Sequence, residues 1–171
     1  MKKIVVAGGC FWGVEEYFRR CIGTYETRVG YAQGILDTPD YKKVCSGKTM
    51  HAEVVEITYE ENMLSLQKVL EHLFRIIDPT SLNKQGNDIG TQYRAGVYPE
   101  TEEDFKIAQD YIASRQKDYA KPIVFELEYL KKFWEAEAYH QEYLVNNPGG
   151  YCHVDMHKIK PEELKEEYRK K

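Results

Sequence analysis

Long apolar stretches, an excess of basic residues and closely paired cysteines are all missing from this sequence of 171 residues. Four cysteines are too few for a small fold that depends on many disulfides, and no Cys-x-x-Cys pair of the zinc-binding kind occurs. The 24 Lys and Arg residues are outnumbered by 28 Asp and Glu residues, which argues against a dedicated nucleic-acid-binding protein. With 42% hydrophobic and 30% charged residues, the composition excludes disordered, collagen-like and transmembrane chains and indicates one globular domain.

An apolar run of the length that export requires is also missing at the N-terminus. Two lysines precede the run at 4–7, but a secretory signal needs roughly seven or more apolar residues. The run instead has the composition of a short buried strand. We therefore expect a cytoplasmic protein, and in that reducing compartment cysteines are more often catalytic or metal-binding than disulfide-bonded.

Strand and helix patterns alternate along the chain without a linker, a repeat or a low-complexity segment, which predicts a single α/β (α+β) domain. Two polar segments, 33–50 and 79–92, are longer than ordinary connections, so we expect functional loops there. The spacing of apolar residues predicts helices at 13–21, 64–77, 102–118 and 135–146, and strands at 3–8, 27–32, 52–59, 93–98 and 123–129.

Cys10 lies where the first predicted strand turns, through Gly8 and Gly9, into a helix. The partial positive charge of a helix N-terminus favours the thiolate, so this position predicts a lowered pKa and a reactive nucleophile. The alternative is a small buried side chain that ends a strand. Phe11 and Trp12 favour the nucleophile, because two large aromatic side chains beside a thiol would form a hydrophobic cup.

Glu53 shares the parity of Val55, Ile57 and Tyr59, so it lies on the more apolar face of the strand predicted at 52–59. Burial on that face would raise the pKa of its carboxyl and let it donate a proton near neutral pH. The alternative is a glutamate at the end of a strand that reaches solvent.

The segment around Cys10, Gly8-Gly9-Cys10-Phe11-Trp12-Gly13 followed by Glu15-Glu16, is the first of a series of motifs. The others are Gly30-Tyr31-Ala32, Tyr41 to Val44, Cys45-Ser46-Gly47-Lys48-Thr49, His51-Ala52-Glu53-Val54-Val55, Asp78-Pro79-Thr80, Asn83, Gln85-Gly86-Asn87-Asp88, Gly90-Thr91-Gln92-Tyr93-Arg94, Lys121-Pro122-Ile123, Ala136-Glu137, Tyr139-His140-Gln141, Tyr143-Leu144 and Tyr151-Cys152-His153. In this order, and over residues 4–154, the motifs resemble those of the peptide methionine sulfoxide reductase A (MsrA) family.

The resemblance implies a single domain whose mixed sheet has a split βαβ (ferredoxin-like) core, with helices packed on it and long coil segments. It implies reduction of the S epimer of methionine sulfoxide, free or in oxidised proteins, with thioredoxin as reductant, or dithiothreitol in vitro. It implies no bound cofactor, no metal, and no nucleic-acid or membrane partner. We expect the catalytic domain at 1–156 and a charged tail at 157–171, solvated or disordered after Pro161.

The resemblance also assigns roles by matching motif. Cys10 would be the nucleophile, and Cys152 the cysteine that resolves the oxidised nucleophile by forming a disulfide. Phe11 and Trp12 would hold the methyl group of the substrate, and Asp88 would help to bind it. The sulfoxide oxygen would be protonated by Glu53 and hydrogen-bonded by Tyr41 and Tyr93.

Five positions depart from the usual family pattern, and none touches the expected chemistry. Gln33 and Met50 stand where glycine is usual, so they could alter loop shape and substrate entry. Trp134-Glu135 replaces a more usual Tyr-Pro, and Ala138 replaces an aspartate.

The remaining cysteines and histidines have structural interpretations. Cys21 falls on the apolar stripe of a helix, and we expect it to be a buried structural thiol. Cys45 lies in a loop motif, and we expect a buried structural thiol there too, with a backup thiol as the alternative. We expect His51 and His140 to make structural hydrogen bonds.

Two other function classes remain open. A cysteine hydrolase or transferase would need His51, His140 or His153 as a base beside Cys10, together with an oxyanion hole. A non-catalytic aromatic pocket that binds methionine-rich partners is the third possibility.

Overall fold

The computed structural model describes residues 1–169 of the chain. Its strands are β1 (Lys2–Gly8), β2 (Thr24–Ala32), β3 (Ala52–Tyr59), β4 (Lys84–Gln85), β5 (Asp88–Ile89), β6 (Ala95–Tyr98), β7 (Glu126–Leu127) and β8 (Phe133–Glu135). Its α-helices are α1 (Phe11–Arg19), α2 (Tyr41–Cys45), α3 (Leu66–Ile76), α4 (Glu102–Arg115) and α5 (Tyr143–Asn146).

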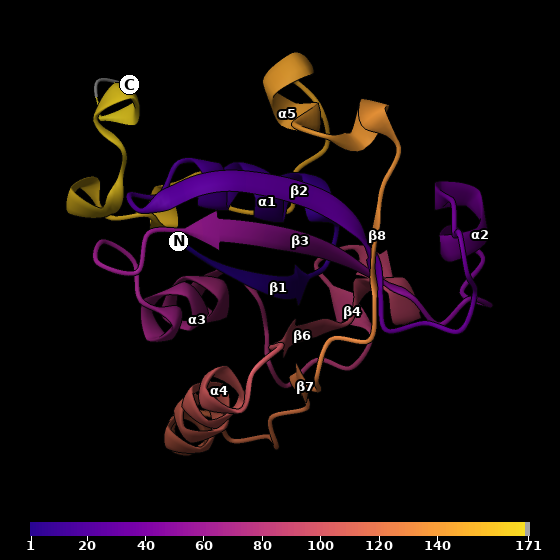
Figure 1. Ribbon diagram of the computed structural model, residues 1–171, viewed down its shortest axis with the longest axis horizontal. Coiled ribbons are helices and arrows are strands. Elements are labelled where there is room, and N and C mark those ends of the chain that lie inside the picture. The colour runs from indigo at the N-terminus through magenta and orange to yellow at the C-terminus, as the bar shows by residue number, and fades with distance from the viewer. Residues whose placement is uncertain (170–171) are drawn as a thin grey trace.

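Six strands form one mixed sheet in the order β7-β6-β1-β3-β2-β8 (Figure 1). β1 lies at the centre, antiparallel to both β3 and β6, and β2 is antiparallel to β3. The units β1-α1-β2 and β3-α3-β6 are therefore each a βαβ unit whose two parallel strands are separated by an inserted strand. This order confirms the split βαβ, ferredoxin-like core that the resemblance implied.

The main core lies between one face of the sheet and the helices α1, α3 and α4. Alternate residues of the central strands, such as Val6, Val55 and Val97, are fully or almost fully buried there. The opposite face is covered by a later segment of the chain, where Leu130 and Phe133 pack on a second, smaller cluster. β1 points toward the side of the molecule on which α2 lies, away from both labelled chain ends (Figure 1). The loops at that end of the sheet carry the candidate site.

The predicted helix at 135–146 is wrong, because tertiary hydrogen bonds replace helical ones. The backbone N–H of Val29 donates to Oε1 of Gln141 at 2.9 Å, and Nε2 of Gln141 donates to the Val29 carbonyl at 2.9 Å. Glu142 then takes a left-handed conformation with φ of 50°. The segment therefore holds only a 3-10 turn at Ala138–His140 and the short helix α5.

The long strand predicted at 123–129 is also wrong in extent, because only the two residues of β7 pair with β6. The strands predicted at 3–8 and 52–59, and the helix predicted at 64–77, agree with the structure to within two residues at each end. The predicted loop at 33–50 holds the additional short helix α2.

The end of the chain stays at least partly exposed, since no described residue after Pro161 is buried, but as far as the structure describes it this segment makes specific contacts with the domain. Glu163 accepts hydrogen bonds from Arg75 at 2.6 and 2.9 Å and pairs with Lys68 at 2.6 Å. Cys21 and Leu164 form an isolated antiparallel bridge, and Ile159 is buried. Residues 157–169 are thus held against α1 and α3, while the last two residues lie outside the described part.

Candidate functional site

The turn between β1 and α1 places Cys10 at the first helical turn. Gly9 has φ of +90°, and a Cβ atom there would lie 2.8 Å from Cβ of Gln85 and 2.9 Å from Nε2 of His153. Only glycine combines this left-handed conformation with so close an approach. Cys10 is consequently the N-cap residue of α1, and 7% of its surface is exposed.

The expected lowering of the Cys10 pKa is wrong. Burial raises the pKa of this thiol well above its usual range, and the nearby carboxyl groups of Glu53 and Asp88 raise it further. The backbone N–H of Trp12 lowers the pKa, as a helix N-terminus should, but the effect of burial is larger. Cys10 is therefore a thiol at neutral pH in the unliganded site.

Glu53 lies beside this turn, on the helix-covered face of β3, as its parity predicted. Its side chain is almost completely buried, with 1% of the residue exposed. Burial raises the pKa of its carboxyl to about 8, against the opposing effect of the Phe11 N–H, and the charge of Asp88 raises it further. At neutral pH this carboxyl is mainly protonated.

The two oxygens of Glu53 have different surroundings. Oε1 accepts a hydrogen bond from the Phe11 backbone N–H at 3.1 Å. Oε2 is buried and has no hydrogen-bond partner among the residues that the structure describes. Because the N–H donor requires an acceptor, the acidic proton belongs on Oε2. The site thus contains a buried proton donor with no partner of its own.

Tyr41, the first residue of α2, and Tyr93, in the 3-10 turn Thr91–Tyr93, lie near this carboxyl. Burial raises the pKa of both phenols above the ordinary value. For Tyr41 the next causes are its hydrogen bond to Cys45 and the charge of Glu53, and for Tyr93 the next is Glu53. Both phenols therefore keep their protons and can donate hydrogen bonds at neutral pH.

Aromatic rings form one wall of the site. Phe11 is buried against Tyr31 and Tyr41, with ring centroids 5.7 and 6.5 Å apart. Trp12 stacks on Tyr143 at 3.9 Å with an interplanar angle of 16°. The Trp12 ring is thus held by contact along one face, and Phe11 is packed among other aromatic rings.

Each of the three histidines that could serve a hydrolase as its base is hydrogen-bonded to another group. Nδ1 of His140 accepts a hydrogen bond from the Trp12 indole at 3.0 Å, and burial lowers the pKa of this imidazole. His51 bonds to the Gly34 N–H at 3.0 Å and to a backbone carbonyl at 2.6 Å. Nε2 of His153 bonds to a backbone carbonyl at 2.9 Å. In the described chain none of these rings hydrogen-bonds to Cys10, which counts against the hydrolase alternative.

Asp88 and Cys152 are brought to the same end of the sheet by a short hairpin and by the C-terminal segment. Asp88, in β5, accepts a hydrogen bond from the Tyr151 hydroxyl at 3.0 Å. Cys152 is exposed, and a Cβ atom on Gly13 of α1 would lie 3.0 Å from its sulfur. Gly13 therefore allows Cys152 to approach α1 at the turn that follows Cys10.

The structure describes all four cysteines as free thiols. Cys21 is fully buried and its thiol donates to the Tyr17 carbonyl at 3.4 Å, as a structural thiol should. The expectation for Cys45 is wrong, because Cys45 is exposed at the end of α2. Its thiol is hydrogen-bonded to the Tyr41 phenol, which places it at the edge of the site.

Glu137 is a residue whose position the sequence did not explain. Its Oε1 accepts a hydrogen bond from the Tyr31 hydroxyl at 2.8 Å. Its Oε2 accepts from the Tyr41 backbone N–H at 3.1 Å and from the Tyr139 hydroxyl at 3.2 Å. These donors keep the pKa of Glu137 below its usual value despite the opposing effect of burial. The carboxylate thereby fixes the start of α2, which carries Tyr41.

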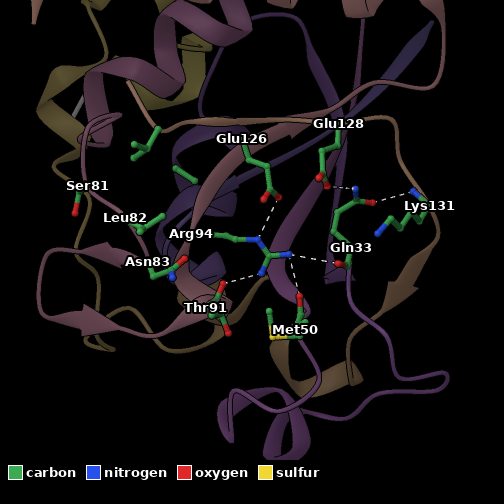
Figure 2. Close-up of a pocket in the computed structure, with 12 residues that line it drawn as sticks. Gln33, Met50, Ser81, Leu82, Asn83, Thr91, Arg94, Glu126, Glu128 and Lys131 are labelled. Atoms are coloured by element: carbon green, nitrogen blue, oxygen red, sulfur yellow. Dashed lines mark hydrogen bonds and ion pairs between the residues drawn. The ribbon is translucent and has the colours of Figure 1, made fainter. Parts of the chain in front are cut away.

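Arg94 connects several segments of the chain by hydrogen bonds (Figure 2). Its guanidinium donates to the carbonyls of Thr91 at 2.8 Å, Met50 at 2.9 Å and Gln33 at 3.4 Å, and to the Glu126 carboxylate at 3.1 Å. These hydrogen bonds connect the loops at 33–50 and 79–92 with β7. Arg94 also lines a cavity of about 320 Å³.

The two departures from the family's glycines lie at this junction. Gln33 and Met50 have φ of 70° and 60°, the left-handed region that favours glycine. The Gln33 amide offsets part of this strain by bonding to Glu128 at 3.0 Å and to the backbone of Tyr129 and Lys131. Both positions thus take a backbone conformation that glycine would adopt without strain.

Neither a membrane-spanning helix nor a metal-binding cluster is present in residues 1–169. No helix there is long and apolar enough to cross a membrane. No group of three or more His, Cys, Asp or Glu side chains is arranged there to hold a metal ion.

Comparison with known proteins agrees with this geometry. Residues 2–171 match the family model described as "Peptide methionine sulfoxide reductase". The chain is similar to the peptide methionine sulfoxide reductase MsrA of Clostridium botulinum strain Okra, with 56% identity over 91% of this chain and 99% of that protein. It is also similar to the crystal structure of Mxr1 from Saccharomyces cerevisiae in reduced form, with a TM-score of 0.82 and 38% identity over 91% of this chain and 90% of that one.

The structure of Mxr1 in complex with Trx2 is similar as well, with a TM-score of 0.57 and 26% identity over 83% of this chain and 84% of that one. The family match over nearly the whole chain and the high identity to a curated member lead to one conclusion. The chain belongs to the peptide methionine sulfoxide reductase family.

Proposed function

We propose that the protein is a peptide-methionine (S)-S-oxide reductase that repairs oxidised methionine in proteins and also reduces free methionine S-sulfoxide. One observation carries this proposal: a buried carboxyl group, protonated on an oxygen without a partner, lies beside a free thiol in an aromatic cup. A sulfoxide needs these two groups together, because its sulfur accepts a nucleophile while its oxygen must accept a proton to leave.

Substrate binding uses the surroundings of Cys10. Phe11 and Trp12 hold the methyl group on the sulfoxide sulfur by apolar contact. The phenols of Tyr41 and Tyr93 donate hydrogen bonds to the sulfoxide oxygen and stabilise the negative charge that develops on it. Asp88 helps to bind the substrate.

In the first chemical step the Cys10 sulfur attacks the sulfoxide sulfur while Glu53 donates its proton to the sulfoxide oxygen. The Cys10 thiol passes its proton to the resulting Glu53 carboxylate as a bond forms between the Cys10 sulfur and the substrate sulfur. The hydroxyl on the substrate sulfur then moves to the Cys10 sulfur while the bond between the two sulfurs breaks. The net change is transfer of one oxygen atom: the sulfoxide is reduced to methionine, and the Cys10 thiol is oxidised to a sulfenic acid.

The Cys152 thiol then condenses with the Cys10 sulfenic acid. A sulfur–sulfur bond forms, the sulfur–oxygen bond of the sulfenic acid breaks, and water leaves. Thioredoxin returns both cysteines to thiols by dithiol–disulfide exchange and becomes oxidised itself. The complex of the related Mxr1 with Trx2 supports this partner, and dithiothreitol would substitute for it in vitro.

We place this chemistry in residues 1–156 and in the reducing cytoplasm, where the thiols that it needs persist. The segment at 157–169 supports that domain through its contacts with α1 and α3.

Replacing Cys152 with serine tests the proposed function. We expect Cys152→Ser to form about one methionine per enzyme molecule at the wild-type rate, since the first step does not use this thiol. Turnover with thioredoxin should fall at least about a hundredfold, because no disulfide is available for exchange. The measurement is methionine release from a peptide S-sulfoxide, with and without thioredoxin. A hydrolase using Cys10 would predict intact turnover of its own substrate in the same variant.

A second variant, Glu137→Gln, tests the support of Tyr41. The amide cannot accept from the Tyr41 N–H and the two phenols as the carboxylate does, so we expect the first step to slow about tenfold. The single-turnover rate measures this, and the exposed Glu135→Gln is the matched control. In a Tyr41→Phe background the further loss should be small, because the carboxylate would act through Tyr41. An undiminished rate in Glu137→Gln alone would contradict this role.

A further inference from the structure

We propose that His153 is a positioning residue for the second step, holding Cys152 close to Cys10 so that the disulfide closes quickly. The inference rests on the proposed function, in which Cys152 resolves the Cys10 sulfenic acid. It concerns a side chain that has no part in the steps described above, and it assigns that side chain to one step of the reaction only.

The His153 ring reaches across to the strand that leads into the nucleophile. Nε2 lies 2.9 Å from the carbonyl oxygen of Gly8, the last residue of β1. A carbonyl only accepts hydrogen bonds, so Nε2 carries the proton and donates it. Nδ1 is buried and has no hydrogen-bond partner in the described chain. The contact with Gly8 is therefore the polar contact that fixes this ring.

Two glycines leave room for the His153 ring. A Cβ atom on Gly9 would lie 2.9 Å from Nε2 of His153, and one on Gly86 would lie 3.5 Å from Cβ of His153. Glycines thus face the imidazole on both sides, one in the nucleophile turn and one in the β4-β5 hairpin. The ring occupies the gap between these two elements, and Cys152 is the residue just before it.

Residues on both sides of Cys152 make contacts with the rest of the domain. Tyr151 donates to Asp88 at 3.0 Å, and Val154 is buried against α1. By contrast, a Cβ atom on Gly149 would meet nothing within 4 Å. Without the contact at His153, Tyr151 and Val154 would be the remaining flanking anchors, and Cys152 between them would spend less time near Cys10. Two groups that react within one molecule do so at a rate set by this local concentration.

Two polar substitutions separate the hydrogen bond from the bulk of the side chain. Glutamine can place an amide N–H where Nε2 of the imidazole lies, whereas the shorter asparagine cannot reach the Gly8 carbonyl. We expect His153→Asn to close the disulfide about tenfold more slowly than the wild type, and His153→Gln to stay within about twofold. Both variants should form methionine in the first step at the wild-type rate.

The experiment mixes each protein with one equivalent of a peptide S-sulfoxide in the absence of reductant. Methionine is quantified over time, and mass analysis of the Cys10 and Cys152 peptides follows the disulfide and a dimedone adduct of the sulfenic acid. His157→Asn is the matched control, since this ring is exposed and bonds only to its neighbour Asp155. Thermal melting of every variant shows that the fold is retained.

The possible outcomes distinguish the role of His153 from the proposed function on which it rests. A dimedone adduct that accumulates on Cys10 in His153→Asn, with normal methionine formation, supports the role of His153. Disulfide closure at the wild-type rate in His153→Asn, or equal slowing in His153→Gln, overturns it. Failure of the wild type to form methionine, or a wild-type disulfide that omits Cys152, would instead overturn the proposed function.

Discussion

Replacing Cys10 with serine is expected to abolish reduction of methionine S-sulfoxide to the background of the uncatalysed reaction. A serine hydroxyl is a far weaker nucleophile than sulfur and cannot form a sulfenic acid. The geometry of the turn should survive, because serine is a good N-cap residue and nearly the same size. The measurement is methionine release from a peptide S-sulfoxide with dithiothreitol as reductant, which bypasses any effect on thioredoxin.

The matched control for this variant is Cys45→Ser. Cys45 is a second thiol at the edge of the site, and a serine hydroxyl there can still pair with the Tyr41 phenol. We expect this variant to keep most of the activity. Measurable turnover by Cys10→Ser would show that another thiol or another mechanism performs the first step.

Replacing Glu53 with glutamine is expected to slow the first step by about a hundredfold to a thousandfold, the usual cost of removing one donor to a developing oxyanion. Substrate binding should change little, because glutamine has nearly the same shape. In the wild type the rate of this step should fall as pH rises through about 8, where Glu53 loses its proton. Single-turnover rates between pH 6 and pH 10 measure both effects, and a variant as fast as the wild type would exclude Glu53 as the acid.

The same carboxyl has an effect on stability whose sign is opposite to that of most acidic groups. Its pKa is about 8 in the folded protein against an ordinary 4.5, so folding favours the protonated form. Its contribution to stability is fully present below pH 4.5 and is lost as pH rises through about 8. Urea unfolding should therefore find that Glu53→Gln gains stability relative to the wild type between pH 5 and pH 9, by roughly a few kcal/mol.

The sequence predicts the central elements well because their patterns are local. The parity of Glu53 along β3 and the glycines before Cys10 are properties of one short segment, and both predictions agree with the structure. The positions that the sequence could not explain depend on distant partners. Glu137 acts on Tyr41 across 96 residues, and His153 on Gly8 across 145.

The predictions that the structure contradicts also concern properties that depend on distant parts of the chain. The pKa of Cys10 depends on how deeply the complete fold buries it, and the helix N-terminus is only one of several contributions. The charge of residues 157–169 suggested solvation, but Lys68 and Arg75 supply opposite charges from another element. Cys45 looked like a structural thiol because the sequence does not show which face of α2 is exposed.

The central position of β1 has a consequence for the order in which the molecule can assemble during synthesis. β1 and Cys10 leave the ribosome before both neighbours of β1 in the sheet, β3 and β6. The contact of His153 with Gly8 must wait until almost the whole chain has emerged. A nascent chain therefore carries its nucleophile before the neighbouring strands that bury it are made, and a segment made much later completes the surroundings of Cys10.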